Sequence, residues 1–445
     1  MDWQDKKILI IGLARSGMAA IRLLRHVGAR NITLVEEKAI DNKEVLEEMG
    51  VEVCAQSPEV FARDFDIVIK NPGVSPTKDF ILDLKERNIP VITEVELAYQ
   101  IAKPQHYIAI TGTNGKTTTT TLVYQILEKA YGNMAHVAGN IGVPLSELVL
   151  ENRLDENEGH YIALELSNGQ LVDIDTFHPD VATFINMTPD HIDFMGGLDA
   201  YYQSKTRIYK NMSGNDVFLL NSDDEIVKEY TKKYPPTCTV KRFSLGNENA
   251  DAYYKKNHIF IEGNEILDIT KVTLPGLHNI QNILIAAYAC YFAGVSKEDI
   301  QDVVYNFKGV AHRIEFVREV NGVKYYNDSK ATNTDATITA LKSFDKNVIL
   351  LVGGFEKGLS MEDVIPYLRC VKKVIGFGDA GDRIADDLVG NQKSVVQTLK
   401  DAIDYANQIA ESGDIVLLSP TTSSFDQYKN FEERGNDFKR IVEEL

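Results

Sequence analysis

Short apolar runs alternate with longer amphipathic segments along most of this 445-residue chain. Apolar runs of about four to six residues are typical of buried strands, and apolar positions repeated with the helical period are typical of helices. The predicted strands are residues 7–11, 31–35, 66–69, 91–92, 107–110, 161–166, 181–185, 217–220, 348–352, 373–377 and 415–418. The predicted helices include residues 18–27, 118–129, 201–209, 280–292 and 399–410. This alternation predicts an α/β protein built on parallel sheets.

Two polar joints, at residues 103–105 and 308–310, divide the chain into three predicted domains. A length of 445 residues also suggests about three domains of roughly 150 residues each. We predict an N-terminal Rossmann-like domain (1–103), a central P-loop ATPase-like domain (104–309) and a C-terminal Rossmann-like domain (310–445). Within the central domain, residues 241–274 change to short segments with turns, which predicts an added small β-sheet.

Composition and charge exclude several classes of protein. The hydrophobic fraction of 44% is typical of a soluble globular protein, and the net charge of -18 argues against a nucleic-acid partner. No apolar run reaches the roughly 20 residues that cross a bilayer, and the N-terminus lacks a signal-peptide core. The four cysteines lack metal or redox spacing. We expect a cytoplasmic protein with reduced thiols that binds neither nucleic acid nor membrane.

A glycine-rich turn between a strand and a helix carries the strongest chemical signal, Thr111-Gly-Thr-Asn-Gly-Lys-Thr117. Backbone N–H groups of such a turn, together with the helix N-terminus, bind phosphate oxygens. Lys116 would reach the β/γ-phosphates, and the Thr117 hydroxyl would bind Mg²⁺. Ile110 replaces the first glycine of the common pattern. We nevertheless predict a nucleotide triphosphate site, with a simple glycine turn and a solvated lysine as the alternative.

A second glycine turn, Gly12-Leu-Ala-Arg-Ser-Gly17, follows the first strand. With Glu36 and Glu37 about 20 residues later, it partly matches a dinucleotide fingerprint. The second glycine of that fingerprint is an alanine, so the turn could hold NAD, another nucleotide-linked substrate, or no ligand at all. Residues 71–76 end a later strand of the same sheet and could line the same crevice.

Candidate metal ligands follow two strands of the central domain. Glu165 ends a strand beside the phosphate loop, where a carboxylate can hold Mg²⁺, and Asp190 and His191 follow another strand. His191 is the second candidate ligand. Lys205 lies in a predicted helix, and composition alone favours a solvated lysine there.

These motifs, in this order, resemble the ATP-dependent Mur ligases of peptidoglycan synthesis. The matching residues are Thr111 to Thr117, Gly139-Asn-Ile-Gly142, Glu165, Asp190-His191, Lys205, Gly276-x-His278-Asn279-x-x-Asn282, His312-Arg313, Asp328-Ser-Lys-Ala-Thr-Asn333 and the segment 419–438. The last two motifs are similar to those of the members that add D-glutamate. The resemblance covers nearly the full chain, although Asn168-Gly169 stands where the family usually has Ser-Phe, and Thr421-Thr422 where it usually has Ala-Cys.

The resemblance implies an amide-forming reaction in cytoplasmic peptidoglycan precursor synthesis. ATP would phosphorylate the carboxylate of UDP-N-acetylmuramoyl-L-alanine, and the amine of D-glutamate would attack the acyl phosphate through a tetrahedral intermediate. The resemblance also implies ATP, two Mg²⁺ and a carbamylated Lys205. We expect a monomer.

The resemblance further implies a role for each matching position. The catalytic residues would be Lys116, Glu165, His191 and Lys205. The metal ligands would be Thr117, Glu165, His191 and Lys205. The nucleotide-binding residues would be Gly112, Thr113, Asn114, Gly115, Lys116, Thr117, Thr118, Asn279, Asn282, Arg313, Asp328 and Lys330. The substrate-binding residues would be Arg15, Ser16, Glu37, Lys38, Gly73, Asn140, His191, Thr332, Lys357, Ser424, Phe425 and Phe431.

Four alternatives remain to be weighed against this interpretation. A diaminopimelate- or lysine-adding ligase would carry an Asp-Asn-Pro-Arg-like motif in the last domain, and the sequence has none. A folylpolyglutamate-type ligase would lack a complete N-terminal α/β domain. An oxidoreductase would leave the phosphate loop unexplained. A non-catalytic ATP-binding switch would need the loop but not the set Glu165, His191, Lys205 and Lys357 together.

Overall fold

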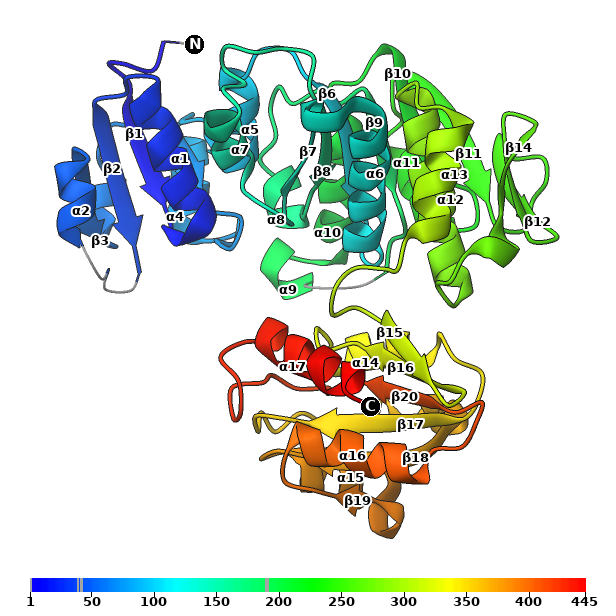
Figure 1. Cartoon of the computed structure of the whole chain (residues 1–445). Helices are drawn as coiled ribbons and strands as arrows, with labels where there is room; N and C mark the ends of the chain where they lie inside the picture. Colours follow the sequence, from blue (N-terminus) through cyan, green and yellow to red (C-terminus); the bar gives the residue numbers. More distant parts are fainter. Residues whose placement is uncertain (1, 38–39, 41–42, 189–191) are drawn as a thin grey trace. The chain divides into compact units, whose positions relative to one another are not determined.

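A computed structural model describes residues 2–37, 40, 43–188 and 192–445 of the chain. It contains three β-sheets and divides into two compact units. The first unit is Met1–Lys271 with Ile280–Tyr305, and the second is Val272–Asn279 with Asn306–Leu445. Figure 1 shows the sheets of the first unit in blue to green and that of the second in yellow to red. The predicted α/β class is confirmed, while the division into the three predicted domains stays a prediction.

The first sheet is parallel throughout, in the order β3-β2-β1-β4-β5. Its strands are β1 Lys7–Ile11, β2 Asn31–Glu36, β3 Val51–Ala55, β4 Ile67–Lys70 and β5 Val91–Thr93. Its helices are α1 Ala14–His26, α2 Lys43–Glu48, α3 Pro58–Phe61, α4 Asp79–Glu86 and α5 Glu94–Ile101. The sequence pattern did not predict β3, because polar Glu52 interrupts its apolar run.

The central sheet has nine strands in the order β14-β13-β12-β11-β10-β9-β6-β8-β7. The strands are β6 His106–Thr111, β7 Ala135–Gly139, β8 Tyr161–Glu165, β9 Val181–Phe184, β10 Gly214–Asn221, β11 Cys238–Ser244, β12 Ala252–Lys255, β13 His258–Ile261 and β14 Asn264–Asp268. The segment predicted as an added small sheet is β12, β13 and β14, which pair antiparallel with one another and extend the central sheet at its edge (Figure 1).

Helices of the central region connect these strands and follow them. They are α6 Lys116–Tyr131, α7 Leu145–Glu151, α8 Asn168–Leu171, α9 Ile192–Met195, α10 Leu198–Thr206, α11 Glu225–Lys233, α12 Leu277–Phe292 and α13 Lys297–Asn306. The predicted helix 201–209 is α10 followed by a 3₁₀ turn, Arg207–Tyr209. No helix in the described ranges combines the length and the apolar character that a membrane crossing requires.

Buried polar contacts join the first sheet to the central region within the first unit. Glu96 of α5 is fully buried, and its carboxylate accepts the backbone N–H groups of Asp175, Thr176 and Phe177 at 2.9–3.0 Å. Buried Glu94 accepts the N–H of Ser146 at the start of α7, and burial raises the pKa of Glu94 to about 7. Helix α5 of the first sheet is therefore anchored to the central region through Glu94 and Glu96.

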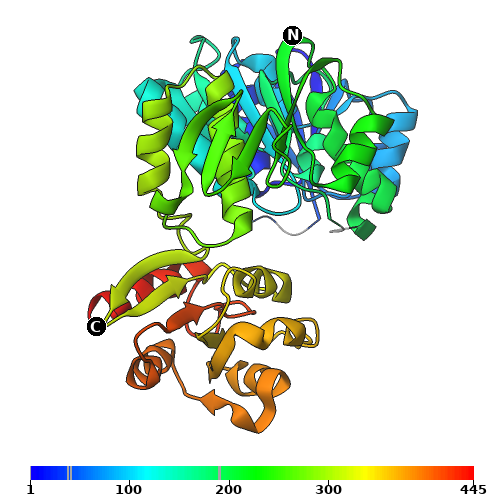
Figure 2. The same ribbon diagram turned by 90° about the vertical axis from the view of Figure 1, so that its right-hand side faces the viewer.

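The sheet of the second unit has the order β15-β16-β20-β17-β18-β19, with one antiparallel pair, β15 and β16. Its strands are β15 Glu315–Val320, β16 Val323–Asn327, β17 Val348–Gly353, β18 Val371–Phe377, β19 Ser394–Val395 and β20 Ile415–Leu418. Apolar residues of α14 (Thr334–Leu341) and α15 (Gly381–Val389) belong to one core, and those of α16 (Leu399–Ile409) and α17 (Phe431–Glu443) to another. The sheet is thus covered on both faces (Figure 2).

Candidate functional site

The phosphate loop joins β6 to α6 as the sequence predicted. Gly115 precedes α6 with a φ of 83°, and no side chain caps the amino end of the helix there. A Cβ atom at Gly115 would collide with the side-chain oxygen of Asn282, so only glycine fits this turn. The backbone N–H groups at the start of α6 can therefore donate hydrogen bonds to an anionic ligand.

Asn186 shapes this loop from the end of β9. Its Oδ1 accepts the backbone N–H groups of Thr113 and Asn114 at 3.1 and 2.9 Å. Its Nδ2 donates back to the carbonyl of Asn114 at 3.1 Å. The Lys116 ammonium donates to the carbonyls of Gly112 and Thr113 at 3.0 and 2.8 Å, so it folds over its own loop.

Glu165 ends β8 beside the loop and is 1% exposed. Its Oε1 accepts from the side-chain amide of Asn140 at 2.7 Å, while its Oε2 is buried with no partner among the described residues. An unpaired buried carboxylate oxygen is unfavourable by several kcal/mol, which indicates a place for a cation. Across residues 2–37, 40, 43–188 and 192–445, no three His, Cys, Asp or Glu side chains cluster as a metal site.

Lys205 lies on α10 and is 1% exposed. Its ammonium donates to the carbonyl of Gly112 at 3.0 Å and to Asn168 Oδ1 at 2.7 Å. It also lies 4.8 Å from the centre of the Tyr201 ring. The solvated-lysine alternative is therefore wrong, because helix packing against the phosphate loop buries this side chain.

Three predicted or matching residues lie outside the described ranges: Lys38, Asp190 and His191. The predicted roles of Lys38 in substrate binding and of His191 in catalysis, metal binding and substrate binding stay predictions.

The glycine turn after β1 is closed by side chains of the first sheet. Glu36 Oε2 accepts the N–H of Leu13 at 2.7 Å, and Ser16 Oγ accepts from Asn71 at 3.0 Å. Asn71 Oδ1 accepts the N–H of Gly73 at 2.9 Å. The predicted crevice residues Ser16 and Gly73 are therefore linked through Asn71.

Two other predicted substrate-binding residues are Arg15, which lies in this turn, and Glu37, which follows β2. Arg15 donates to the carbonyl of Gly142, 3.1 Å away, and so links the turn to the loop after β7. Glu37 is exposed, and its N–H is held by the side chain of Glu36 at 2.9 Å.

Two of the predicted nucleotide-binding residues, Asn279 and Asn282, have different surroundings. Asn282 is 3% exposed and accepts from the Thr119 hydroxyl of α6 at 3.2 Å, which places it behind the phosphate loop. Asn279 belongs to the second unit, and its side-chain amide donates to the carbonyl of Pro275 at 2.7 Å.

The carboxyl edge of the second unit's sheet holds a buried carboxyl group, Asp328. Its two oxygens accept from the backbone of Ile314 at 3.2 Å and from the hydroxyl of Ser419 at 2.8 Å. Burial raises the pKa of Asp328 to about 7, against opposing contributions from Ser419 and Arg313. Asp328 and Arg313, both predicted nucleotide contacts, are thus electrostatic neighbours.

Arg434 of α17 organises the same edge, and no site role was predicted for it. It is 0% exposed and donates to the Ser329 hydroxyl and carbonyl at 3.0 and 2.9 Å. It also donates to the carbonyls of Thr422 and Ser423 at 3.1 and 3.2 Å. Burial lowers its pKa to about 10, so it stays cationic at neutral pH.

The predicted substrate-binding residues of the second unit differ in exposure. Ser424 is buried, Phe425 is 65% exposed, and the exposed Lys357 ammonium lies 3.5 Å from the carbonyl of Thr332. The Lys330 ammonium lies 5.8 Å from the centre of the Phe431 ring. The adjacent Ser423 hydroxyl is buried and unpartnered in the described part of the chain, so it is available to a polar substrate group.

Asn168, Asn186 and Arg434 are the residues of these edges that sequence reasoning missed. Asn186 and Arg434 shape loops through backbone N–H or carbonyl groups, whereas Asn168 binds Tyr201, Ser204 and Lys205 of α10. No periodicity or spacing predicts such contacts. Of the three, Asn168 alone stands out in the sequence, because Asn168-Gly169 departs from the usual Ser-Phe of the family.

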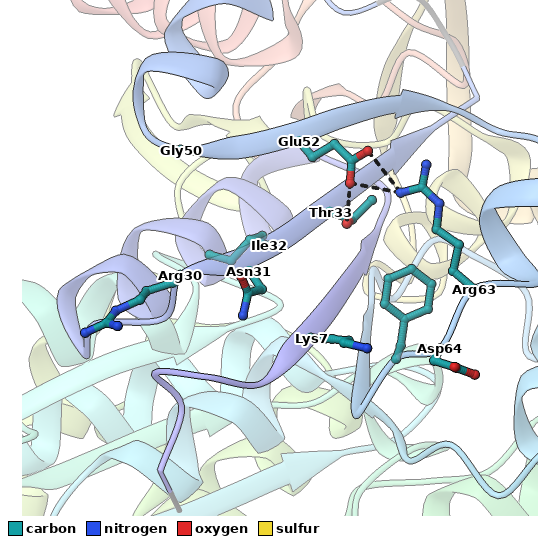
Figure 3. Close-up of a pocket in the computed structure, with 10 residues that line it drawn as sticks. Lys7, Arg30, Asn31, Ile32, Thr33, Gly50, Glu52, Arg63 and Asp64 are labelled. Carbon is teal, nitrogen blue, oxygen red and sulfur yellow. Dashed lines mark hydrogen bonds and ion pairs between the residues drawn. The ribbon is translucent and has the colours of Figure 1, made fainter.

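A separate cavity of about 600 Å³ lies where the strands of the first sheet begin (Figure 3). Lys7, Arg30 and Asn31 line it, together with an ion pair between Glu52 and Arg63 at 2.9 Å. Because ligands of parallel sheets bind at the carboxyl ends of strands, this cavity lies at the opposite end from the predicted site. None of the predicted site residues lines it.

Two protein-family models match the chain. The model described as Mur ligase middle domain matches residues 110–290, and the one described as Mur ligase, glutamate ligase domain matches residues 312–422.

Curated relatives match over nearly their whole length. A UDP-N-acetylmuramoylalanine–D-glutamate ligase of Geobacillus kaustophilus is 40% identical over 455 residues, covering 100% of this chain and 98% of that protein. Proteins of the same name from Streptococcus agalactiae and Listeria monocytogenes are each 38% identical, covering 100% of this chain and 98% and 97% of those proteins.

Solved structures share the fold at lower identity. A UDP-N-acetylmuramate–alanine ligase of Thermotoga maritima has a TM-score of 0.56 at 17% identity, covering 99% of this chain and 100% of that one. A UDP-N-acetylmuramoyl-L-alanyl-D-glutamate–2,6-diaminopimelate ligase has a TM-score of 0.55 at 18% identity, covering 98% and 92%. These likenesses concern the fold alone.

Proposed function

Because this chain belongs to the Mur ligase family, we propose that it is an ATP-dependent ligase that joins D-glutamate to UDP-N-acetylmuramoyl-L-alanine. One observation carries the proposal: Lys205 is buried against the phosphate loop, and Glu165 is buried beside that loop with one unpaired carboxylate oxygen. A simple nucleotide switch needs the loop, but it does not need this additional buried pair.

The proposed reaction begins with phosphoryl transfer from ATP to the substrate carboxylate. Such transfer depends mainly on positioning and on neutralising charge. The N–H groups at the start of α6 and the Lys116 ammonium would bind the phosphates. Asn140, which already holds Glu165 at 2.7 Å, would contact the muramoyl-alanine end. The D-glutamate nitrogen then attacks the acyl carbon and loses a proton, and phosphate leaves as the amide forms.

The residues present fit Mg²⁺ at the central edge. The unpaired Glu165 Oε2 and the Thr117 hydroxyl would hold one ion. Glu165, His191 and a modified Lys205 would hold a second. When bound, Mg²⁺ would neutralise charge on the ATP phosphates and on the incoming carboxylate.

Lys205 would need modification to serve as a ligand, because an ammonium repels a metal cation. In the proposed carbamylation, the neutral Nζ amine adds to the carbon of CO₂ and releases one proton. The side chain then carries an anionic carbamate and keeps one N–H. The hydrogen-bond acceptors at 2.7 and 3.0 Å from Nζ can hold that remaining N–H.

At the edge of the second unit, D-glutamate would bind with its carboxylates between Lys357 and the 423–425 loop. The Ser423 hydroxyl, buried without a partner among the described residues, supports this assignment together with Ser424. A lysine or diaminopimelate side chain would instead place an ammonium near Lys357. Charge therefore favours an acidic amino acid.

The test is phosphate release from ATP in the presence of UDP-N-acetylmuramoyl-L-alanine, with D-glutamate, L-glutamate, L-lysine and diaminopimelate compared. We expect release only with D-glutamate and only when both substrates are present. Release with another amino acid would replace the proposed substrate but keep the ligase chemistry. ATP binding without any release would contradict the ligase. The cytoplasmic location and the monomeric state stay predictions.

A further inference from the structure

We propose that Asn168 is a positioning residue that holds the Lys205 side chain in place for carbamylation at the phosphate loop. The proposal rests on the proposed function, because it concerns the same buried lysine. Asn168 is neither a predicted site residue nor a candidate ligand. It is the first residue of α8, which directly follows the strand that ends at Glu165.

The orientation of the Asn168 amide is fixed by its partners. Its Nδ2 donates to the carbonyl of Tyr201 at 2.9 Å and to the hydroxyl of Ser204 at 2.7 Å. Ser204 Oγ in turn donates to the same carbonyl at 2.8 Å, so it has a lone pair for the amide. Both amide hydrogens are therefore committed to α10.

Only the amide oxygen remains for Lys205, whose Nζ lies 2.7 Å from Asn168 Oδ1. Flipping the amide would place its NH₂ group against the lysine nitrogen, where two donors face each other. Asn168 thus binds α10 through its nitrogen and the end of the Lys205 side chain through its oxygen. It fixes the direction in which Lys205 leaves the helix.

The backbone of Asn168 is held from the opposite side. The preceding Ser167 and Gln170 form a capping box, with Gln170 Oε1 accepting the N–H of Ser167 at 2.9 Å. A Cβ at Gly169 would collide with the carbonyl of Pro72, so the glycine lets the loop after β4 pack directly on α8. The amide is therefore presented from a short helix that is fixed at both faces.

This arrangement suits both states of Lys205. The ammonium donates to Asn168 Oδ1, and a carbamate keeps one N–H that the same oxygen can accept. An aspartate would have a similar shape, but its carboxylate would stabilise the ammonium and repel the carbamate. It would also lose both donors to α10. Charge and geometry together thus favour an amide at position 168.

The experiment compares wild type with Asn168→Ala and Asn168→Asp, using Asn211→Ala as the matched control. Asn211 also donates its amide to two backbone carbonyls of the same unit, those of Asp175 and Phe177, at 2.8 and 2.9 Å. ¹³C NMR after incubation with ¹³C-bicarbonate measures the lysine carbamate directly, and Lys205→Ala identifies its resonance. Phosphate release gives kcat and KM, and thermal unfolding checks the fold.

We expect Asn168→Ala to lower the carbamate signal and to reduce kcat roughly 10- to 100-fold, as for other residues that orient a metal ligand. The KM for ATP should change less than about threefold, since no phosphate contact is lost. Added bicarbonate should restore part of both signal and kcat. Asn168→Asp should lose the signal, and Asn211→Ala should keep it.

Full carbamate signal and full kcat in Asn168→Ala would overturn the positioning role, as would the absence of a Lys205-dependent signal in the wild type. A wild-type enzyme that releases no phosphate with D-glutamate would instead contradict the proposed function. In that case the NMR comparison still decides whether Asn168 positions Lys205. The two failures are therefore distinguishable.

Discussion

The carboxyl edges of the central sheet and of the second unit's sheet each hold one buried cation and one buried carboxyl group. At the central edge these are Lys205, 1% exposed, and Glu165, 1% exposed. At the other edge they are Arg434, 0% exposed, and Asp328, 4% exposed. Both pairs lie beside loops that follow parallel strands, where ligands of α/β proteins bind.

The two edges differ in how completely these groups are satisfied. Arg434 donates to the Ser329 hydroxyl and to the carbonyls of Thr422 and Ser423, and both oxygens of Asp328 accept hydrogen bonds. Glu165 keeps one buried oxygen without a partner in the part of the chain that the structure describes. An arginine stays charged, whereas a lysine amine can react with CO₂. We infer that the central edge is built for chemistry and the other edge for a preformed loop.

Replacing Lys116 by alanine should give the largest effect, because it removes the cation of the phosphate loop. Charge neutralisation during phosphoryl transfer is worth about 10³-fold or more in kcat. Melting temperature should change far less than kcat, since Lys116 lies at the start of α6 and its ammonium donates to the carbonyls of Gly112 and Thr113 in its own loop. Phosphate release and thermal unfolding measure the two quantities.

The control for Lys116→Ala is Lys129→Ala on the same helix, where an exposed lysine pairs with Asp302 at 2.7 Å. Surface pairs of this kind contribute about 0–1 kcal/mol, so this variant should keep its activity. Equal activity of the two variants would remove the phosphate loop from the proposed chemistry.

Lys205→Ala should lower kcat by about 10²-fold, in the range found when one residue that orients or holds a metal is lost. Short-chain carboxylates such as acetate or propionate should restore part of the rate, since they can supply the anionic oxygen of the missing carbamate. Titrating the carboxylate against phosphate release tests this. A variant with full activity and no response to carboxylate would make Lys205 a structural cation like Arg434.

Arg434→Lys should reduce the stability of the protein more than the specific activity of its folded fraction. A lysine has three donors in place of the five of a guanidinium, so buried carbonyls of residues 422 and 423 lose partners. We expect about 3 kcal/mol of lost stability, typical of breaking a buried network. Calorimetry measures it, with Arg440→Lys on the exposed face of α17 as control. Equal melting temperatures would contradict the structural role of this cation.

The sequence predicted the fold class, most strands and the phosphate loop, because apolar period and glycine spacing are local properties. It placed Lys205 in a helix, yet nothing local shows that this helix packs on Gly112 and buries the lysine. The contacts of Asn186 and Arg434 escaped prediction for a related reason. Each contacts backbone groups of residues far away in the chain. Every residue type has these groups, so the sequence does not show which residues are the partners.

Domain organisation illustrates the same limit. The joint at residues 103–105 is visible as a polar break, and α5 just before it reads as an ordinary amphipathic helix. The structure shows Glu94 and Glu96 of that helix buried against the central region. In sequence, these two glutamates are indistinguishable from glutamates on a solvated helix. Whether they are buried depends on their partners, the N–H groups of segments far away in the sequence.

Asp328→Asn tests the carboxyl half of the comparison, through the pH dependence of stability. The pKa of Asp328 is raised from 3.8 to about 7 in the folded protein, so the folded state binds its proton more tightly than the unfolded state. Its contribution to stability is complete below about pH 4 and is lost as pH rises through about 7. Asparagine does not titrate, so the unfolding free energy of the variant should rise relative to that of the wild type as the pH increases over this window.

The expected shift is about 2–4 kcal/mol between pH 4 and pH 8, at about 1.4 kcal/mol per pKa unit. The NH₂ group of asparagine meets the donors of Ser419 or Ile314, which adds a penalty that is independent of pH. The informative quantity is therefore the slope, against pH, of the difference in unfolding free energy. Urea unfolding at several pH values measures it. Exposed Asp345→Asn should give a flat difference. A flat curve for Asp328→Asn as well would mean that Arg313 and Arg434 keep this carboxylate ionised, and the two edges would then differ only in their cations.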